Sequence, residues 1–302
     1  MKKKIQSIIF LLLATIIWGS AFVSQSIGMD HIGPFTFQAV RCFMAVAGLF
    51  LGSVVADCVQ KKGKGFIARW TDPKLWKVGL LCGIPLFLAC NLQQVGLVDT
   101  DAGKSGFLTA MYIVIVPVIG IFLKKKPTIM VPISVTLAVV GLYFLSCMGV
   151  TQINPGDLLT LGCALMFAVQ ITFVDMLAQE LDALRLNAIQ CFVCAVLSTV
   201  VMLFTETPTW SGITACAVPL VHAGILSMGV GYFLQIVGQQ SLDATPATLI
   251  MSLESVFAAL FGVVLLNEVM TGWEIFGCCL IFIAVILSQI PVKIRKKVHL
   301  SN

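Results

Sequence analysis

Ten long apolar segments run through this chain, and they constrain its fold more than any other feature. Each has about the 20 residues that a helix needs to cross the hydrocarbon core of a bilayer, whereas a membrane β-barrel would need shorter, alternating segments. Of the 302 residues 59% are hydrophobic and only 11% are charged, where soluble domains carry about 25% charged residues. We therefore expect an all-α membrane protein with ten transmembrane helices, over residues 5–27, 34–56, 75–98, 102–123, 128–147, 156–178, 185–204, 215–240, 243–266 and 271–291.

A short polar seam over residues 147–157 separates the segments into two sets of five. Nine residues beginning at Gln38 resemble nine beginning at Asn187, with Ala, Cys and Phe at matching positions. An odd number of spans per half turns the second half upside down, so we predict two inverted five-helix repeats, a recurrent plan of secondary transporters. Chance similarity between apolar helices, which draw on few residue types, is the alternative. The predicted parts are the two repeats at 5–148 and 155–291 and a basic cytoplasmic tail at 292–302.

Lysine and arginine residues gather in alternate loops, which predicts the orientation of the chain. With the N-terminus in the cytoplasm, 17 of the 19 fall on the cytoplasmic side, while Lys104 falls outside and Arg41 within a span. Basic residues in short loops face the cytoplasm, so both termini are expected there. The start of the chain imitates a secretory signal peptide, but the spans that follow favour an uncleaved first helix. The basic runs are short and lie between apolar segments, which is not typical of a nucleic-acid-binding protein.

Two charged residues lie at membrane depth, and they are the leading candidates for substrate recognition or coupling. Glu254 is at the middle of the ninth segment, on a face of small residues, where a carboxylate costs about 2.5–3.5 kcal/mol on insertion scales. Arg41 lies in the second segment, on the same face as Gln38, and must pair with a carboxylate, carbonyls or water. The matching positions of the second half carry Asn187 and Gln190. For both charges, a hydrogen bond that only ties two helices together is the alternative.

Uncharged polar residues in other segments complete the predicted lining of a central site. The substrate-binding candidates are Arg41, Glu254, Asn91, Gln94, Gln190, Tyr232 and Gln235. A bond between helices is again the alternative for each amide and hydroxyl. The eleven Cys residues are scattered through the apolar segments, and even Cys191 and Cys194 have no nearby His or base, which favours plain packing. One His in a span cannot build a metal site, and we find no phosphate loop and no nucleophile elbow. We therefore expect no catalytic residue, no metal and no cofactor.

Short motifs in four segments form a recognisable combination: Trp18-Gly-Ser-Ala-Phe, Arg41, Asp101-Ala-Gly-Lys-Ser-Gly-Phe-Leu-Thr-Ala with Val116-Pro, and Leu253-Glu-Ser-Val with Leu266-Asn-Glu. Along essentially the whole chain they resemble the EamA-like ten-helix transporters of the drug/metabolite transporter superfamily. Ser255 stands where that family usually has Pro, and Asn267 where it usually has Gly, which predicts a straighter ninth helix.

The resemblance implies a transporter of small metabolites, most often an exporter, in a bacterial cytoplasmic membrane. It also implies a cavity lined by helices one to four and six to nine. We therefore predict a multi-pass protein of the cell (plasma or inner) membrane. We expect it to be a secondary transporter that exports a small polar or zwitterionic, amino-acid-like metabolite by alternating access. The expected partners are this substrate and the lipid bilayer, and a homodimer stays open.

Two other classes of protein are the rivals of a transporter. A non-transporting receptor or scaffold would be expected to carry a larger soluble part than the longest polar loop here, around residues 57–74. A membrane-embedded enzyme would need paired carboxylates, a metal-ligand set or a nucleophile with its base at membrane depth. None of these is evident in the sequence, so we expect no enzymatic activity.

Overall fold

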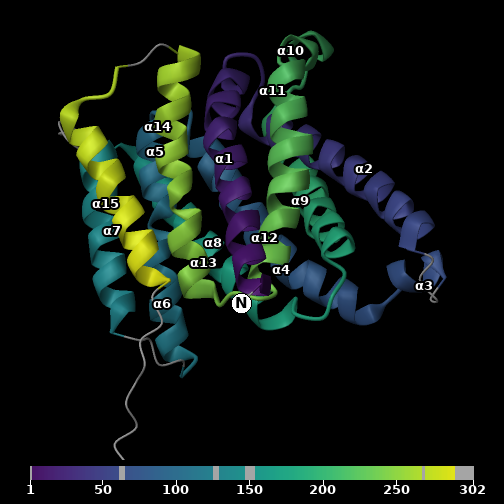
Figure 1. Cartoon of the computed structure of the whole chain (residues 1–302). Coiled ribbons are helices and arrows are strands. Elements are labelled where there is room, and N and C mark those ends of the chain that lie inside the picture. Colours follow the sequence, from purple (N-terminus) through teal and green to yellow (C-terminus); the bar gives the residue numbers. More distant parts are fainter. Residues whose placement is uncertain (1, 61–64, 125–128, 147–153, 267–268, 290–302) are drawn as a thin grey trace, which may run out of the picture.

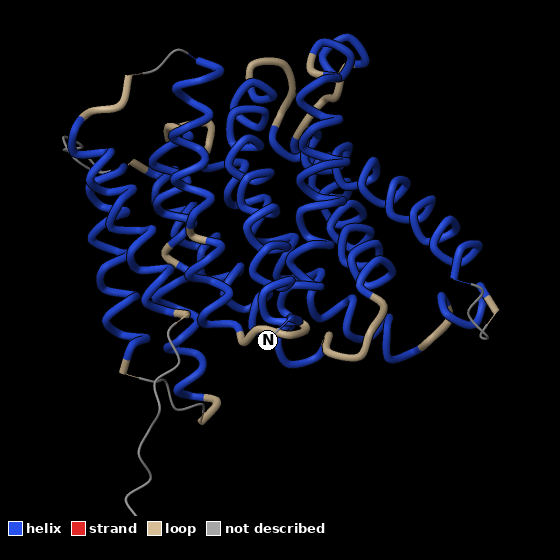
Figure 2. The backbone as a smooth tube through the Cα atoms, in the orientation of Figure 1, coloured by secondary structure: helices blue, strands red, loops and turns tan. Residues whose placement is uncertain are grey.

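The computed structural model describes residues 2–60, 65–124, 129–146, 154–266 and 269–289, and the regular elements of this part are all helices (Figure 2). The all-α prediction is confirmed for these residues. The seam residues 147–153, the Asn267-Glu268 motif and the tail at 292–302 lie outside the described residues. So do several basic residues used to predict the orientation, namely Lys61, Lys62, Lys64, Lys125, Lys126, Lys293, Arg295, Lys296 and Lys297.

Eight helical segments are long and apolar enough to cross a membrane. Single helices form five of them: α1 (Lys2–Met29), α2 (Pro34–Gln60), α4 (Pro73–Gly96), α8 (Pro155–Leu177) and α9 (Ala183–Thr205). Consecutive helices form the other three: α5 (Ala102–Ala110) with α6 (Tyr112–Phe122), α11 (Ala217–Val221) with the π-helix η1 (His222–Gly231) and α12 (Tyr232–Gln239), and α13 (Ala244–Met251) with α14 (Leu253–Leu266). The remaining helices are α3 (Phe66–Trp70), α7 (Met130–Ser146), α10 (Trp210–Ala215) and α15 (Gly272–Ser288). The chain is thus a multi-pass membrane protein.

The ten predicted segments correspond to these eight spans and to α7 and α15. These two helices have 17 residues each, which is the lower limit for crossing the hydrocarbon core. The ninth segment is interrupted at Ser252, between α13 and α14, although Ser255 replaces the usual proline. The substitution has therefore not made this span one continuous helix.

Polar residues at the start of α8 tie the two halves of the chain together. The Asn154 side chain accepts a hydrogen bond from Asp157 N, and the Asp157 carboxylate accepts one from Asn154 N, both at 2.9 Å. This reciprocal capping box satisfies backbone donors that a helix start leaves free. Lys104 Nζ lies 2.5 Å from Asp157 Oδ2, and Thr100 donates to Asp157 Oδ1 at 3.0 Å. The end of α4 and the start of α5 are thereby held against the first turn of α8.

Two helix pairs define the frame of the bundle (Figure 1). The pair of α7 and α15 lies at one side. The two helices approach closely at Gly141 and Gly277, where a Cβ on Gly277 would lie 2.5 Å from the Gly141 oxygen. The other pair is α2 and α9, which pack along each other in opposite directions. Their antiparallel course follows from Glu206, at the end of α9, which accepts hydrogen bonds from the backbone of Phe35 and Thr36, at the start of α2, at 2.9 and 2.8 Å.

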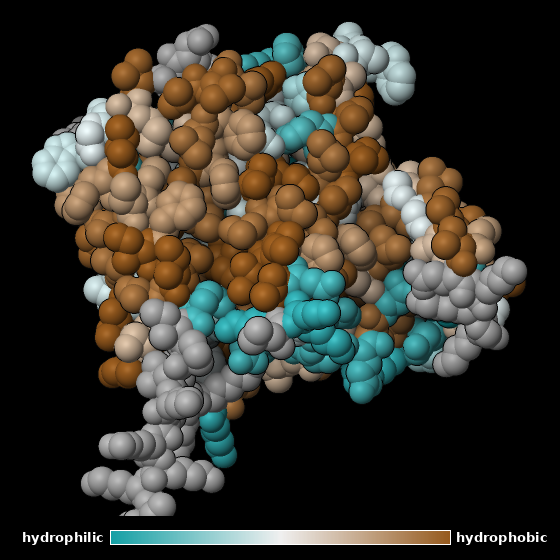
Figure 3. Space-filling view, viewed as in Figure 1, coloured by the Kyte–Doolittle hydropathy of each residue, from teal (hydrophilic) through white to brown (hydrophobic). Residues whose placement is uncertain are grey.

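The surface is apolar and the interior is partly polar, as expected where the solvent is lipid. Apolar side chains cover the middle of the face shown in Figure 3, and hydrophilic ones gather along the edge near the N-terminus. Large hydrophobic side chains of the helices face outward, with Phe122 82% and Phe204 86% exposed. Amides such as Gln38 and Asn187 are fully buried instead. Polar groups at membrane depth are expected to face the inside of the bundle, where they find partners.

Candidate functional site

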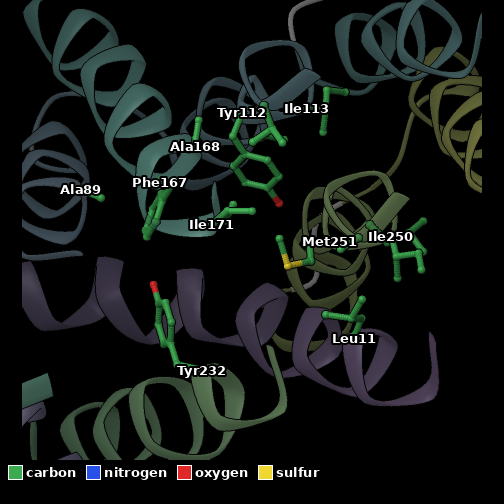
Figure 4. Packing of buried hydrophobic residues seen from close by; sticks show 14 of the residues in the cluster. Leu11, Ala89, Tyr112, Ile113, Phe167, Ala168, Ile171, Tyr232, Ile250 and Met251 are labelled. Atoms are coloured by element: carbon green, nitrogen blue, oxygen red, sulfur yellow. The ribbon is translucent and has the colours of Figure 1, made fainter. Parts of the chain in front are cut away.

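A cavity lies between spans of the two halves. Residues of α1, α2, α4, α5, α6, α8, η1, α12, α13 and α14 line it. The described residues of α7 and α15 do not, and neither do those of α9, the seventh predicted segment, although the resemblance implied that this helix lines the cavity too. In Figure 4, the side chains of Phe167, Tyr232, Tyr112 and Met251 converge on one space from different helices. The full lining consists of Trp18, Phe22, Gln25, Arg41, Gln93, Thr109, Tyr112, Phe167, Gln170, Ile171, Ser227, Met228, Tyr232, Gln235, Met251 and Glu254.

Arg41 lines this cavity from α2 and is 2% exposed. Its guanidinium donates to Gln38 Oε1 at 2.7 Å and to Gln25 Oε1 at 2.5 Å, and it lies 5.6 Å from the centre of the Phe37 ring. The hydrogen-bond partners in the described part of the chain are neutral amides. Amide oxygens hold the guanidinium in place without cancelling its charge, so Arg41 can attract an anionic group in the cavity.

Glu254 lines the cavity from α14, and Tyr112 of α6 donates to its Oε1 at 2.9 Å. Tyr112 is the first residue after the interruption of its span at Met111, and Glu254 is the second residue after the interruption at Ser252. They also lie at equal distances from the start of these spans, since each is the eleventh residue after its N-cap, Asp101 or Asp243. The hydrogen bond therefore joins corresponding positions of the two halves.

Aromatic rings form much of the remaining wall. Trp18 and Tyr232 have ring centres 5.0 Å apart and inclined at 56°. The Trp18 indole donates to Ser227 O at 3.4 Å, and the close approach leaves no room for a side chain at Gly231, where a Cβ would lie 2.6 Å from Trp18 Nε1. Rings beside one cation and one carboxyl suit a ligand that is charged at one end and apolar along its body.

A chain of buried amides runs from the cavity into the second half. Gln235 of α12 donates to Gln170 of α8 at 3.1 Å, Gln170 donates to Gln190 of α9 at 3.2 Å, and Gln190 donates to Asn187 at 2.8 Å. The bond between Gln190 and Asn187 has the same three-residue spacing as the bond between Arg41 and Gln38. The sequence analysis paired these positions, and in both halves the side chains bond to each other.

The structure brings four of the seven predicted candidates together, Arg41, Glu254, Tyr232 and Gln235, which line the same cavity. The other three lie outside the lining. Asn91 donates to Ser198 of α9 at 2.9 Å, Gln94 donates to the Gln25 carbonyl at 3.4 Å, and Gln190 reaches the lining only through Gln170. These three amides connect helices in the conformation described.

Several lining residues were not among the sequence candidates, chiefly Gln25, Gln93 and Tyr112. Gln25 accepts from Arg41, and Gln93 donates to Thr109 at 3.0 Å. Tyr112 had a usable signal, because its distance from Asp101 equals that of Glu254 from the corresponding Asp243. For Gln25 and Gln93 we find no signal in the sequence that separates them from other buried amides.

The lining of the cavity carries groups that can bind a small ligand. In the part of the chain that the structure describes, no three His, Cys, Asp or Glu side chains come together in a way that could hold a metal ion. The charged groups of the lining are Arg41 and Glu254, and amides and aromatic rings surround them. Such a lining offers a donor for an anion, an acceptor for a cation and apolar walls, which is what a small zwitterionic ligand requires.

Comparison with known proteins gives a consistent family. The family described as "EamA-like transporter family" matches this chain twice, over residues 5–147 and 154–289. An uncharacterized transporter of Archaeoglobus fulgidus is 34% identical, over 96% of this chain and 88% of its own length. The uncharacterized transporter YoaV of Bacillus subtilis is 24% identical, over 93% of this chain and 96% of its own. A solved crystal structure shares the fold with a TM-score of 0.72, at 17% identity, over 91% of this chain and 96% of that one.

Proposed function

Because the chain belongs to the EamA-like transporter family, we propose that it is a secondary transporter for a small polar or zwitterionic, amino-acid-like metabolite. The observation that carries this proposal is that Arg41 and Glu254 line the same cavity, together with aromatic rings and amides. Arg41 binds the carboxylate of the substrate, and Glu254 binds its amino group or carries the proton that drives transport. The substrate is moved outward across the cell membrane, with both termini of the chain in the cytoplasm.

The arrangement of the helices supports alternating access between two inverted five-helix repeats. The antiparallel course of α2 and α9 and the matching side-chain bonds of Arg41 and Gln190 favour halves of opposite orientation. Substrate sites of inverted-repeat transporters lie at the interface of the repeats, and interrupted helices often form them. The cavity lies beside two such interruptions, at Met111 and Ser252. Tilting one repeat against the other opens this cavity to each side of the membrane in turn.

Transport in proteoliposomes with an imposed proton gradient tests the role of Glu254. The Glu254→Gln variant keeps the shape and hydrogen bonding of a protonated carboxyl but cannot exchange a proton. We expect it to bind substrate and to lose gradient-driven transport. Glu180→Gln is the matched control, because the Glu180 side chain is 85% exposed and does not line the cavity. It lies 3.5 Å from Lys74 at the surface. Undiminished gradient-driven transport by Glu254→Gln would remove Glu254 from the coupling mechanism.

A further inference from the structure

Gln235 has an oxygen atom without a partner, in a chain of amides whose other side-chain oxygens all accept hydrogen bonds. The residue is 1% exposed and lines the cavity from α12. Its Nε2 donates twice, to Gln170 Oε1 at 3.1 Å and to Gln239 Oε1 at 2.9 Å, which uses both amide hydrogens. Its Oε1 is buried and has no hydrogen-bond partner among the described residues. A buried acceptor without a partner is unfavourable, and a ligand donor can relieve it.

The orientation of this amide is fixed at both ends of the chain by backbone carbonyls, which can only accept. On one side, Gln239 Nε2 donates to Ile171 O at 3.1 Å. On the other, the bonds run through Gln170 and Gln190 to Asn187, whose Nδ2 donates to the η1 carbonyls Met228 O and Gly229 O at 3.1 and 2.8 Å. Turning the Gln235 amide over would set its oxygen against two other oxygens. The oxygen is therefore the only polar atom that Gln235 can offer to a ligand.

We propose that Gln235 is a specificity-determining residue, whose Oε1 accepts a hydrogen bond from an N–H of the substrate's amino group. This inference rests on the proposed function and deepens it, since it predicts that the transporter requires a substrate with an N–H donor. A primary or secondary ammonium supplies this donor. A trimethylammonium group has none, and a 2-oxo acid places a carbonyl oxygen against Oε1. Sites built to hydrogen-bond a substrate group discriminate strongly against analogues that lack the group.

The structure also supplies an internal control. Asn91 is another buried amide whose oxygen has no partner among the described residues, but it does not line the cavity. Its Nδ2 is held by Phe87 O and Ser198 Oγ at 2.8 and 2.9 Å. If an unpartnered buried oxygen affected transport merely through stability, Asn91 and Gln235 would respond alike. Of the two residues, only Gln235 lines the cavity.

The test is counterflow transport by the purified full-length protein in liposomes. The proteinogenic amino acids that have a primary amino group are first offered singly, and then the 2-oxo acid and the N,N,N-trimethyl derivative of each one that is taken up. We expect both derivatives to be transported about tenfold to hundredfold less efficiently than the parent by the wild type. In Gln235→Leu this ratio should fall to within about threefold, while Asn91→Leu should keep the wild-type ratio.

The outcomes separate the inference from the function on which it rests. Equal transport of an amino acid and its trimethyl derivative by the wild type would overturn the role of Gln235, whether or not the Gln235→Leu variant folds. A preserved ratio in a folded Gln235→Leu variant would overturn it as well. Uptake of no amino acid at all would instead refute the amino-acid-like substrate of the proposed function.

Discussion

Replacing Gly277 by Ala tests whether α7 and α15 form a structural pair apart from the cavity. The new Cβ would lie 2.5 Å from the Gly141 oxygen and 2.7 Å from the backbone nitrogen of Leu145, against about 3.5–4.0 Å for an optimal carbon contact. Because both neighbours are backbone atoms, the helices must separate by about 1 Å, and a gap of that size forfeits a quarter to a half of each contact energy. We expect this overpacking to lower the free energy of unfolding by about 1–3 kcal/mol.

Thermal unfolding in detergent measures the effect, with Gly272→Ala as the matched control, since no atom lies within 4 Å of a Cβ at Gly272. A loss of 1 kcal/mol lowers the midpoint by about 2–4 °C in chains of 150–250 residues, so Gly277→Ala should unfold roughly 2–12 °C below the control. Transport by the folded variant should equal that of the wild type, because the lining contains no residue of α15. Equal stability of the two variants, or altered transport at normal stability, would refute the reasoning.

Three further predictions concern the ends of the helices and the topology. Glu206→Ala should lower the unfolding midpoint, because it removes charge-assisted bonds to the start of α2 worth about 1.5–3 kcal/mol each; an unchanged midpoint would contradict this. Lys104→Met should destabilise the protein by about 3–5 kcal/mol, since it leaves the Asp157 carboxylate, 3% exposed, without its charge partner; rescue by Asp157→Asn in the same chain is the check. Fused reporters should indicate cytoplasm near Lys64, Lys125 and Lys296 and the outside near His31, Gln152 and Pro208, and two or more reversed reporters would contradict the inverted arrangement.

Hydropathy in the sequence was sufficient to place the eight spans and the shorter apolar helices α7 and α15. The reason is that every segment that crosses the lipid must be apolar over about 20 residues. Hydropathy was not sufficient to choose the face of α4 that meets the cavity. Asn91, Gln93 and Gln94 are 5%, 6% and 0% exposed, since α4 packs against both α8 and α9. The exposed side chains of Leu80, Ile84 and Leu88 mark the outer face of α4, but its inner side meets two helices, and the periodicity does not tell which buried amide borders the cavity. Only Gln93 meets the cavity, and that depends on neighbours from other parts of the chain.

The partners of Arg41 and the breaks in the helices depend on contacts that a sequence does not display. An intramembrane Arg was expected to pair with a carboxylate, carbonyls or water, and its partners are the side-chain carbonyl oxygens of Gln25 and Gln38, of which Gln25 was not predicted. The interruption at Met111 has neither Pro nor Gly at the break, so local sequence gives no warning of it. In contrast, the cap at Asn154 depends only on side chains within three residues of it, so the local sequence contains what determines it. Features that depend on neighbouring residues can therefore be predicted from the sequence, whereas contacts between helices cannot.

The hydrogen bond between Tyr112 and Glu254 is the contact that the proposed alternating access should change most directly. It joins corresponding positions of the two halves at 2.9 Å, so a relative tilt of the halves must alter it in one of the two states. Tyr112→Phe removes the donor and keeps the ring, and we expect it to reduce gradient-driven transport, the same result that we expect for Glu254→Gln. Because the residues act as a pair, their double variant should show a coupling energy of about 0.5–3 kcal/mol in the log of the transport rate. Tyr143→Phe, at a tyrosine of α7 that is 50% exposed, is the control and should be silent. Additive effects of Tyr112→Phe and Glu254→Gln would mean that the bond only packs α6 against α14 and that the transport cycle does not pass through it.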